Sequence, residues 1–120
     1  MSEKTLYERL GGAAGIARIT EDLWVNHTRN PLIRQRYVKS DPENVKRLVR
    51  EMLGAGTGGP ETYSGKNMLD AHRGMNISEQ EFNTVIDDML DALAKNGVGQ
   101  RERDEILCIL WSMRKEIVAV

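Results

Sequence analysis

The sequence has only one cysteine and no long apolar run, and each of these features excludes certain classes of protein. The lone Cys108 excludes an internal disulfide and a cysteine-based metal cluster, and its apolar surroundings predict a buried side chain. No run approaches the roughly 18 apolar residues that a membrane-spanning helix needs, and the start MSEKTLYERL lacks the apolar stretch of a secretory signal. We therefore expect a cytoplasmic protein that does not contact a membrane.

A strong charge of one sign is also lacking, since the formal net charge is −1. Nucleic acid is therefore an unlikely partner for the chain as a whole. The 120 residues, 40% of them hydrophobic, predict one globular domain spanning residues 1–120. Residues 29–50 are locally basic, with lysines and arginines outnumbering Asp41 and Glu43. A solvated helix face explains this segment, and a helix-turn-helix contact with nucleic acid is the alternative.

The first third of the chain predicts two helices. Thr5–Glu8 is a capping-box sequence that starts a short helix, which Gly11 and Gly12 then stop. Apolar residues at helical spacing predict a second helix from Ala13 to about Thr28, because proline in Asn30-Pro31 cannot continue the hydrogen-bond ladder.

The remainder also predicts helices, with no alternation typical of strands. Asp41 and Pro42 suit the start of an amphipathic helix whose apolar stripe runs from Val45 to Leu53. After a glycine-rich stretch come a short helix, Lys66–Arg73, and a second capping box, Ser78–Glu81. That box opens a long helix ending before Gly97, and a last helix runs from Gln100 to about Val118.

The sequence does not match several familiar motifs of phosphate, metal and hydrolytic sites. A phosphate-binding loop at Gly65-Lys66 would need glycine in place of Pro60 and a hydroxyl residue in place of Asn67. The two histidines, His27 and His72, are too far apart in sequence for a zinc motif, and neither lies beside a serine motif of a hydrolytic triad. His72 shares a helical face with apolar residues, so its ring is either satisfied in the core or used as a ligand.

The order of the pieces resembles the first group of truncated haemoglobins over almost the whole chain. The resemblance is carried by LYERLGG at 6–12, GGPETYSG at 58–65, MLDAHRGM at 68–75 and Phe82. It implies an all-α, two-over-two helical sandwich around haem. The helix of Val45–Leu53 would lie above the haem, the helices from Ser78 and Gln100 below it, and the helix of Ile16–Thr28 would cross.

The resemblance also implies which residues surround a haem b group. His72 matches the histidine that ligates the iron, and a neutral imidazole suits that role. The gas side would comprise Trp24, Tyr37, Val45, Leu48 and Val49. The other haem-lining positions would be Met52, Leu53, Tyr63, Met68, Leu69, Phe82 and Val85. Candidates for pairing with the haem propionates are Lys46, Arg47 and Lys66.

The chain departs from the family pattern over the iron. Many members place a tyrosine and one or two glutamines there, whereas Trp24, Val45 and Val49 occupy the matching positions here. Valine donates no hydrogen bond, so the Trp24 indole and the Tyr37 hydroxyl are the remaining local donors, and Trp24 can equally be a packing residue. We expect an apolar gas side that binds oxygen weakly relative to carbon monoxide.

Two further positions complete these expectations. His27 lies one turn after Trp24 and can in principle serve as a sixth iron ligand, but its place near the helix end favours the surface. Leu53 stands where some relatives carry a phenylalanine at a gas tunnel.

The leading function is reversible binding of oxygen, nitric oxide or carbon monoxide by a monomer. The alternatives are a nitric-oxide dioxygenase served by an external reductase, and a haem-free helical interaction module.

Overall fold

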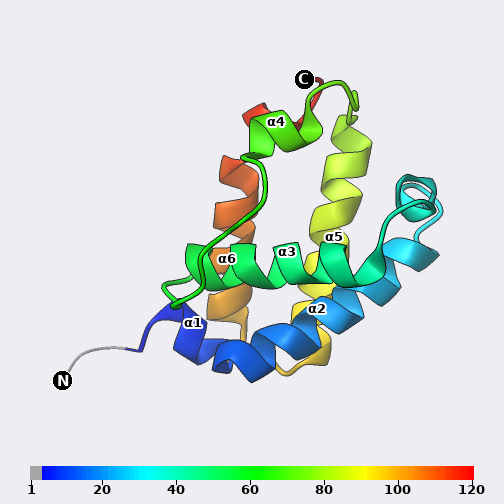
Figure 1. Cartoon of the computed structure of the whole chain (residues 1–120). Helices are drawn as coiled ribbons and strands as arrows, with labels where there is room; N and C mark the ends of the chain where they lie inside the picture. Colours follow the sequence, from blue (N-terminus) through cyan, green and yellow to red (C-terminus); the bar gives the residue numbers. More distant parts are fainter. Residues whose placement is uncertain (1–3) are drawn as a thin grey trace.

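The computed structural model describes residues 4–120, and within this range the chain is helical without any strand (Figure 1). An isolated parallel bridge joins Ile77 and Val118. The α-helices are α1 (Leu6–Arg9), α2 (Gly12–Arg29), α3 (Pro42–Gly56), α4 (Met68–His72), α5 (Glu79–Lys95), α6 (Gln100–Ser112) and α7 (Arg114–Ile117), and a 3₁₀ helix, η1, covers Arg34–Tyr37. Every helix in the described range is too short or too polar to cross a bilayer.

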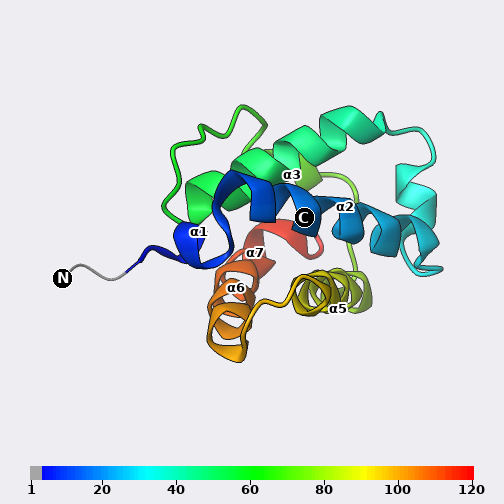
Figure 2. The same ribbon diagram turned by 90° about the horizontal axis from the view of Figure 1, so that it is seen from below.

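The long helices form two layers. Helix α2 packs against both α3 and α5, and α5 packs against α6. Seen from below, α5 and α6 are viewed along their axes beneath α2 and α3, which run across the view (Figure 2). Burial of the facing apolar stripes of the two layers stabilises this arrangement. The predicted all-α, two-over-two sandwich is confirmed.

Local sequence signals fix where the helices begin. The Thr5 hydroxyl accepts a hydrogen bond from the Glu8 amide at 3.1 Å, and Ser78 and Glu81 form the same reciprocal box at α5. The Asp41 carboxylate caps α3 by accepting from the Glu43 amide at 3.1 Å. These three predicted helix starts are confirmed. Each cap stabilises its helix because it satisfies backbone amides that have no partner within the helix.

The predicted last helix is wrong as one continuous element. It breaks at Met113, whose amide bonds back to the Leu110 carbonyl, and α7 then continues in a new direction. The turn lets Ile117 and Val118 pack against Ile77 and Phe82 in a second small core. Burial of that apolar surface offsets the helical bonds lost at the break. Helix α4 is also shorter than predicted, since Asn67 caps it by accepting from the Asp70 amide at 2.8 Å.

The main core lies where α2, α5 and α6 meet, around Ile16, Ile19, Leu93 and Ile106. The prediction that Cys108 is buried is wrong, because its side chain is exposed. Ile106 points into the core, and two residues correspond to about 200° around an α-helix, which turns Cys108 toward solvent.

Candidate functional site

A cavity of about 400 Å³ lies between the helical layers. Its volume and mostly apolar lining fall in the range of sites for small organic ligands and cofactors. The lining side chains come from α2 to α7 and from the segments between them.

His72 reaches this cavity from the last residue of α4. Its Nδ1 lies 2.7 Å from the carbonyl oxygen of Met68, one turn earlier. A carbonyl only accepts hydrogen bonds, so Nδ1 carries the hydrogen and donates it, and in the neutral ring Nε2 is the nitrogen with the lone pair. This contact also fixes the orientation of the ring, as is common for metal-ligating histidines. His72 can therefore hold a metal ion or a haem iron through Nε2.

The loop before α4 is held by polar contacts that position this short helix. The Tyr63 hydroxyl donates to the Lys66 carbonyl at 2.7 Å, and the Ser64 amide donates to the Glu51 carboxylate at 2.9 Å. The Ser64 hydroxyl, which donates to Glu51 at 2.6 Å, is the largest cause that keeps the pKa of Glu51 below its usual value, and the Ser64 amide and the Arg47 guanidinium act in the same direction.

Helix α3 gives the cavity an apolar wall of Val45, Leu48, Val49 and Met52. The α3 residues that line the cavity carry no hydrogen-bonding side chain. Tyr37 lies beside this wall, and burial raises the pKa of its phenol, so the hydroxyl keeps its hydrogen at neutral pH. Tyr37 can thus donate a hydrogen bond in this region.

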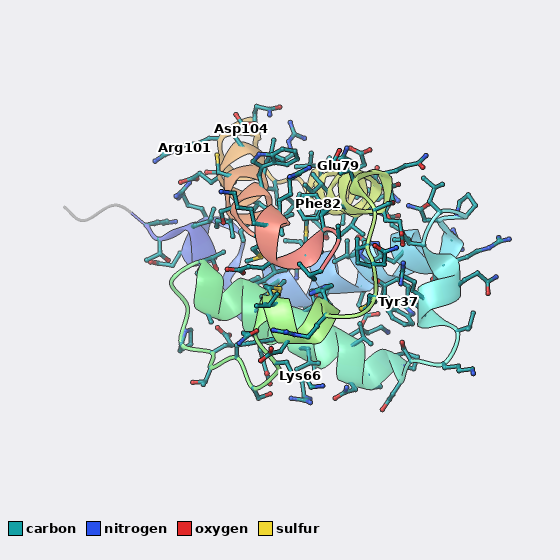
Figure 3. The ribbon with its side chains drawn as sticks, turned by 90° about the horizontal axis from the view of Figure 1, so that it is seen from above. Tyr37, Lys66, Glu79, Phe82, Arg101 and Asp104 are labelled. Carbon is teal, nitrogen blue, oxygen red and sulfur yellow. The ribbon has the colours of Figure 1, made fainter. Side chains whose placement is uncertain are left out.

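Ten of the residues predicted to surround a haem do line this single cavity. Figure 3 shows two of them, Tyr37 and Phe82, on different elements, η1 and α5. Their roles toward haem stay predictions. The ten are Tyr37, Val45, Leu48, Val49, Met52, Tyr63, Met68, His72, Phe82 and Val85.

Three predicted apolar contacts lie outside the cavity lining. Trp24 is half-buried and packs edge-on against Tyr37, with ring centroids 5.7 Å apart. The α2 face that reaches the cavity carries Leu23 and His27, and Trp24 is rotated by about 100° from Leu23. Leu53 lies in the main core, and Leu69 is 37% exposed. The contact with Tyr37 agrees with a packing role for Trp24, and its role toward a gas ligand stays a prediction.

The three predicted propionate partners also lie outside the lining. Lys46 pairs with Glu21 at 2.9 Å, which raises the pKa of its ammonium group. Arg47 contacts Glu51, Asn44 and Ser64. Lys66 is exposed and lies at the edge of the molecule in Figure 3.

Ion pairs also account for part of the basic segment of residues 29–50. Arg36, which the sequence did not single out for the site, lines the cavity and binds the Glu81 carboxylate and the Met75 carbonyl. Like Lys46 and Arg47, it has an acidic partner within this chain. These pairs favour the explanation of a solvated, ion-paired face over a phosphate-binding one.

His27 contradicts its predicted surface position, because its side chain is buried and lines the cavity. Its Nδ1 lies 2.8 Å from the Asp88 carboxylate, and its ring stacks on Tyr37 with centroids 5.5 Å apart. Burial lowers the pKa of His27, while Asp88 acts in the opposite direction. The signal was available, since His27 continues the buried series Thr20 and Leu23 at helical spacing.

Two layers of helices around a mostly apolar cavity, with a histidine in its lining, are typical of the globin class. The bacterial-like globin family matches residues 5–119, so the chain belongs to that family. The predicted resemblance to group 1 truncated haemoglobins is confirmed.

The similarity extends along nearly the whole chain. This chain is 25% identical to the group 1 truncated haemoglobin of Tetrahymena thermophila, over 95% of this chain and 94% of that protein. Identity to the group 1 truncated haemoglobin of Mycolicibacterium paratuberculosis is 26%, over 94% and 83% of the two chains. The Fe(III) crystal structure of the truncated haemoglobin from Tetrahymena pyriformis superimposes with a TM-score of 0.94 at 25% identity, covering 98% of this chain and all of that one (100%).

Membership of this family implies haem binding and haem-based gas binding. The residues present fit such a group, because the cavity is large and mostly apolar and His72, whose Nδ1 is bonded to the backbone, lines it.

Proposed function

We propose that the protein binds haem b without a covalent link, with His72 Nε2 as the proximal iron ligand, and takes oxygen, nitric oxide or carbon monoxide on the side facing α3. The observation that carries the proposal is the 2.7 Å contact between Nδ1 of the cavity-lining His72 and the Met68 carbonyl, which makes Nε2 the nitrogen of the neutral ring that can bind iron. Haem supplies the iron that binds the gas, and the protein sets its access and polarity.

The chain's own residues then have distinct roles. His72 is held in one orientation from within its own helix, so its lone pair is aligned before a ligand arrives. Val45, Leu48 and Val49 exclude water from the gas side and provide no hydrogen bond. Tyr37 supplies a phenol hydroxyl at the edge of this region. This environment favours weakly polarised ligands such as carbon monoxide over oxygen, whose bound form is stabilised by donors.

The test is the visible absorption spectrum of the haem-supplemented protein, ferric, reduced and with carbon monoxide. We expect a sharp Soret band that shifts with carbon monoxide in the wild type and is lost or broadened in His72→Ala. Asp70→Ala is the matched control, because Asp70 is exposed on the same short helix and its pairing with Arg73 is long, at 3.7 Å.

Chemical rescue separates ligation from folding. Free imidazole should restore a histidine-like spectrum to His72→Ala, because it can occupy the space of the missing ring. A wild-type spectrum that is unchanged in His72→Ala would reject His72 as the ligand. A wild-type protein that takes up no haem would reject the whole proposal and favour the haem-free interaction module.

A further inference from the structure

His27 and Asp88 form a buried pair at the cavity that the proposed function does not use. His27 comes from the last turn of α2 and Asp88 from the middle of α5. The side chains are 9% and 16% exposed, and the distance from Nδ1 to the carboxylate oxygen is 2.8 Å. The imidazole ring lines the same cavity as His72.

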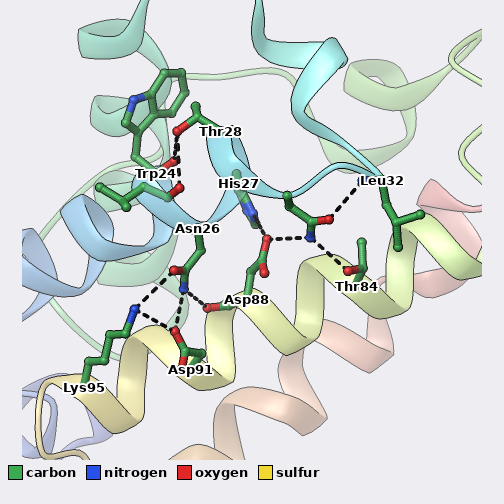
Figure 4. Close-up of polar contacts among 11 residues, drawn as sticks. Trp24, Asn26, His27, Thr28, Leu32, Thr84, Asp88, Asp91 and Lys95 are labelled. Atoms are coloured by element: carbon green, nitrogen blue, oxygen red, sulfur yellow. Dashed lines mark hydrogen bonds and ion pairs between the residues drawn. The ribbon is translucent and has the colours of Figure 1, made fainter.

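The pair is held in place by a polar network between the two helices (Figure 4). Asn30 donates to the same Asp88 oxygen at 3.1 Å and to the Thr84 hydroxyl at 2.9 Å. Asn26 donates to the Asp88 backbone carbonyl at 3.0 Å. Because Asp88 is anchored through its backbone and its side chain, the His27 ring has little freedom to turn.

The carboxylate determines which nitrogen of His27 carries the hydrogen. Asp88 only accepts, so a neutral His27 keeps its hydrogen on Nδ1 and leaves a lone pair on Nε2. No partner for Nε2 is found among residues 4–120. Since burial lowers the pKa of His27, the ring is neutral at pH 7 and its Nε2 is a base.

The neighbours of His27 define what this base can meet. Tyr37 stacks on one face of the ring, and α3 faces the cavity with Val45, Leu48 and Val49. Two charged side chains, Arg36 and Glu81, also line the cavity, and they bind each other. His27 is therefore the basic group left available to a cavity ligand once His72 is engaged.

We propose that His27 is the proton acceptor for ligands that reach ferric haem iron in protonated form, a class that includes hydrogen cyanide, hydrogen sulfide and hydrogen peroxide. The proton of such a ligand would pass to His27 Nε2, its electron pair would stay on the anion that the iron would hold, and the Asp88 carboxylate would balance the imidazolium charge. This inference rests on the proposed haem site.

The first measurement is the tautomer of His27, by NMR of the ring nitrogens in the ¹⁵N-labelled protein with and without haem. We expect a hydrogen on Nδ1 and none on Nε2 in both forms at pH 7. In Asp88→Asn the uncharged amide can accept or donate, so the preference for the Nδ1–H form should weaken. A wild-type His27 with its hydrogen on Nε2 would overturn the proposal.

The second measurement compares two probes by stopped-flow absorbance at pH 7. Cyanide arrives at ferric iron as hydrogen cyanide, whereas carbon monoxide binds ferrous iron and carries no proton. His27→Gln can still accept a hydrogen bond but cannot take a proton, and His27→Leu can do neither. We expect both variants to bind cyanide about 100-fold more slowly, in the range of general base catalysis, with carbon monoxide association changed far less.

The remaining outcomes are also decisive. Unchanged cyanide rates, or equal losses for cyanide and carbon monoxide in both variants, would overturn the proposal, the second result indicating a structural role. A wild-type six-coordinate spectrum that becomes five-coordinate in His27→Leu would identify His27 as an iron ligand instead. If His27→Leu does not fold, His27→Gln and Asp88→Asn carry the test. Absence of the Soret band would mark failure of the haem site itself.

Discussion

At the scale of single residues, the two histidines show how one side chain acquires different chemistry from its neighbours. The Nδ1 of His72 contacts the neutral Met68 carbonyl, while that of His27 contacts the Asp88 carboxylate. Both contacts place the hydrogen of the neutral ring on Nδ1, but only the carboxylate can balance the charge of a protonated ring. A ligand role therefore suits His72, and a base role suits His27.

The apolar α3 wall predicts the effect of adding a donor. Val49→Gln places an amide on the α3 wall, where the other lining residues are Val45, Leu48 and Met52. We expect slower oxygen dissociation, by about tenfold to a hundredfold, because a strong hydrogen bond to a polarised ligand contributes about 1.5–3 kcal/mol. Flash photolysis and stopped-flow mixing measure this change. Val49→Leu is the size control, and equal oxygen kinetics in the two variants would contradict the prediction.

Glu81 predicts a pH-dependent contribution to stability. Arg36 is the main cause that lowers the pKa of Glu81 below 4.5, so the folded state favours the ionised form. This stabilisation is present above the unfolded-state pKa and is lost as the pH falls through the folded-state pKa. Glu81→Gln keeps an acceptor for the capping box at Ser78 but removes the charge.

We therefore expect Glu81→Gln to be less stable than the wild type at pH 7, with the difference shrinking as the pH falls below about 4.5. Urea unfolding followed by circular dichroism at several pH values measures it. The exposed Glu116→Gln is a control for general loss of a carboxylate. A difference that stays constant from pH 7 to pH 3 would show that the charge pair is not responsible.

At the scale of elements, the glycine-rich stretch from the end of α3 into the loop before α4 is explained by close packing around Glu61. Its carboxylate accepts from the Tyr7 hydroxyl at 2.8 Å, which ties α1 to this loop and raises the pKa of Tyr7. A Cβ on Gly54 would lie 2.2 Å from Glu61, and one on Gly59 would lie 2.4 Å from the Tyr7 ring. The glycines provide room for a buried carboxylate.

Gly54→Ala should therefore destabilise the protein by about 1–3 kcal/mol, because Glu61 must move and its bond to Tyr7 is disturbed. Gly56→Ala is a matched control in the same helix, since nothing lies within 4 Å of its added Cβ. We expect that control to be neutral or to stabilise by up to about 1 kcal/mol. Chemical denaturation measures both, and equal effects would refute the packing explanation.

At the scale of the whole molecule, the cavity makes stability depend on its occupant. The space of about 400 Å³ between the layers is lined by apolar side chains of α3 and α5, which a bound group would contact. A group that binds the folded chain and not the unfolded chain stabilises it by mass action. The two helical layers are therefore expected to be held together partly by haem.

Removal of haem should lower the thermal midpoint. Free haem at 100 times its Kd stabilises by about 2.7 kcal/mol, which corresponds to a shift on the order of 10 °C for a chain of this size. His72→Ala should lose much of this gain while its haem-free form melts near the haem-free wild type. Calorimetry with and without haem provides the comparison, and equal midpoints for the wild type in both states would contradict the prediction.

The sequence by itself determined the helical class, the helix starts at Thr5, Asp41 and Ser78, and the candidate ligand His72. The helices and their starts depend on neighbours within a turn or two, where capping and a period of 3.6 residues act directly, whereas His72 is identified by the motif that resembles truncated haemoglobins. The apolar stripe of α3 was visible for the same reason.

Only the tertiary structure decided which side chains meet across the two layers. His27 meets Asp88, 61 residues later, because α5 lies against the end of α2. Trp24 misses the cavity because of how α2 is rotated on α5, and Lys46 is paired because α2 brings Glu21 beside α3. Contacts between elements far apart in sequence depend on the crossing and rotation of whole helices, which local spacing does not encode.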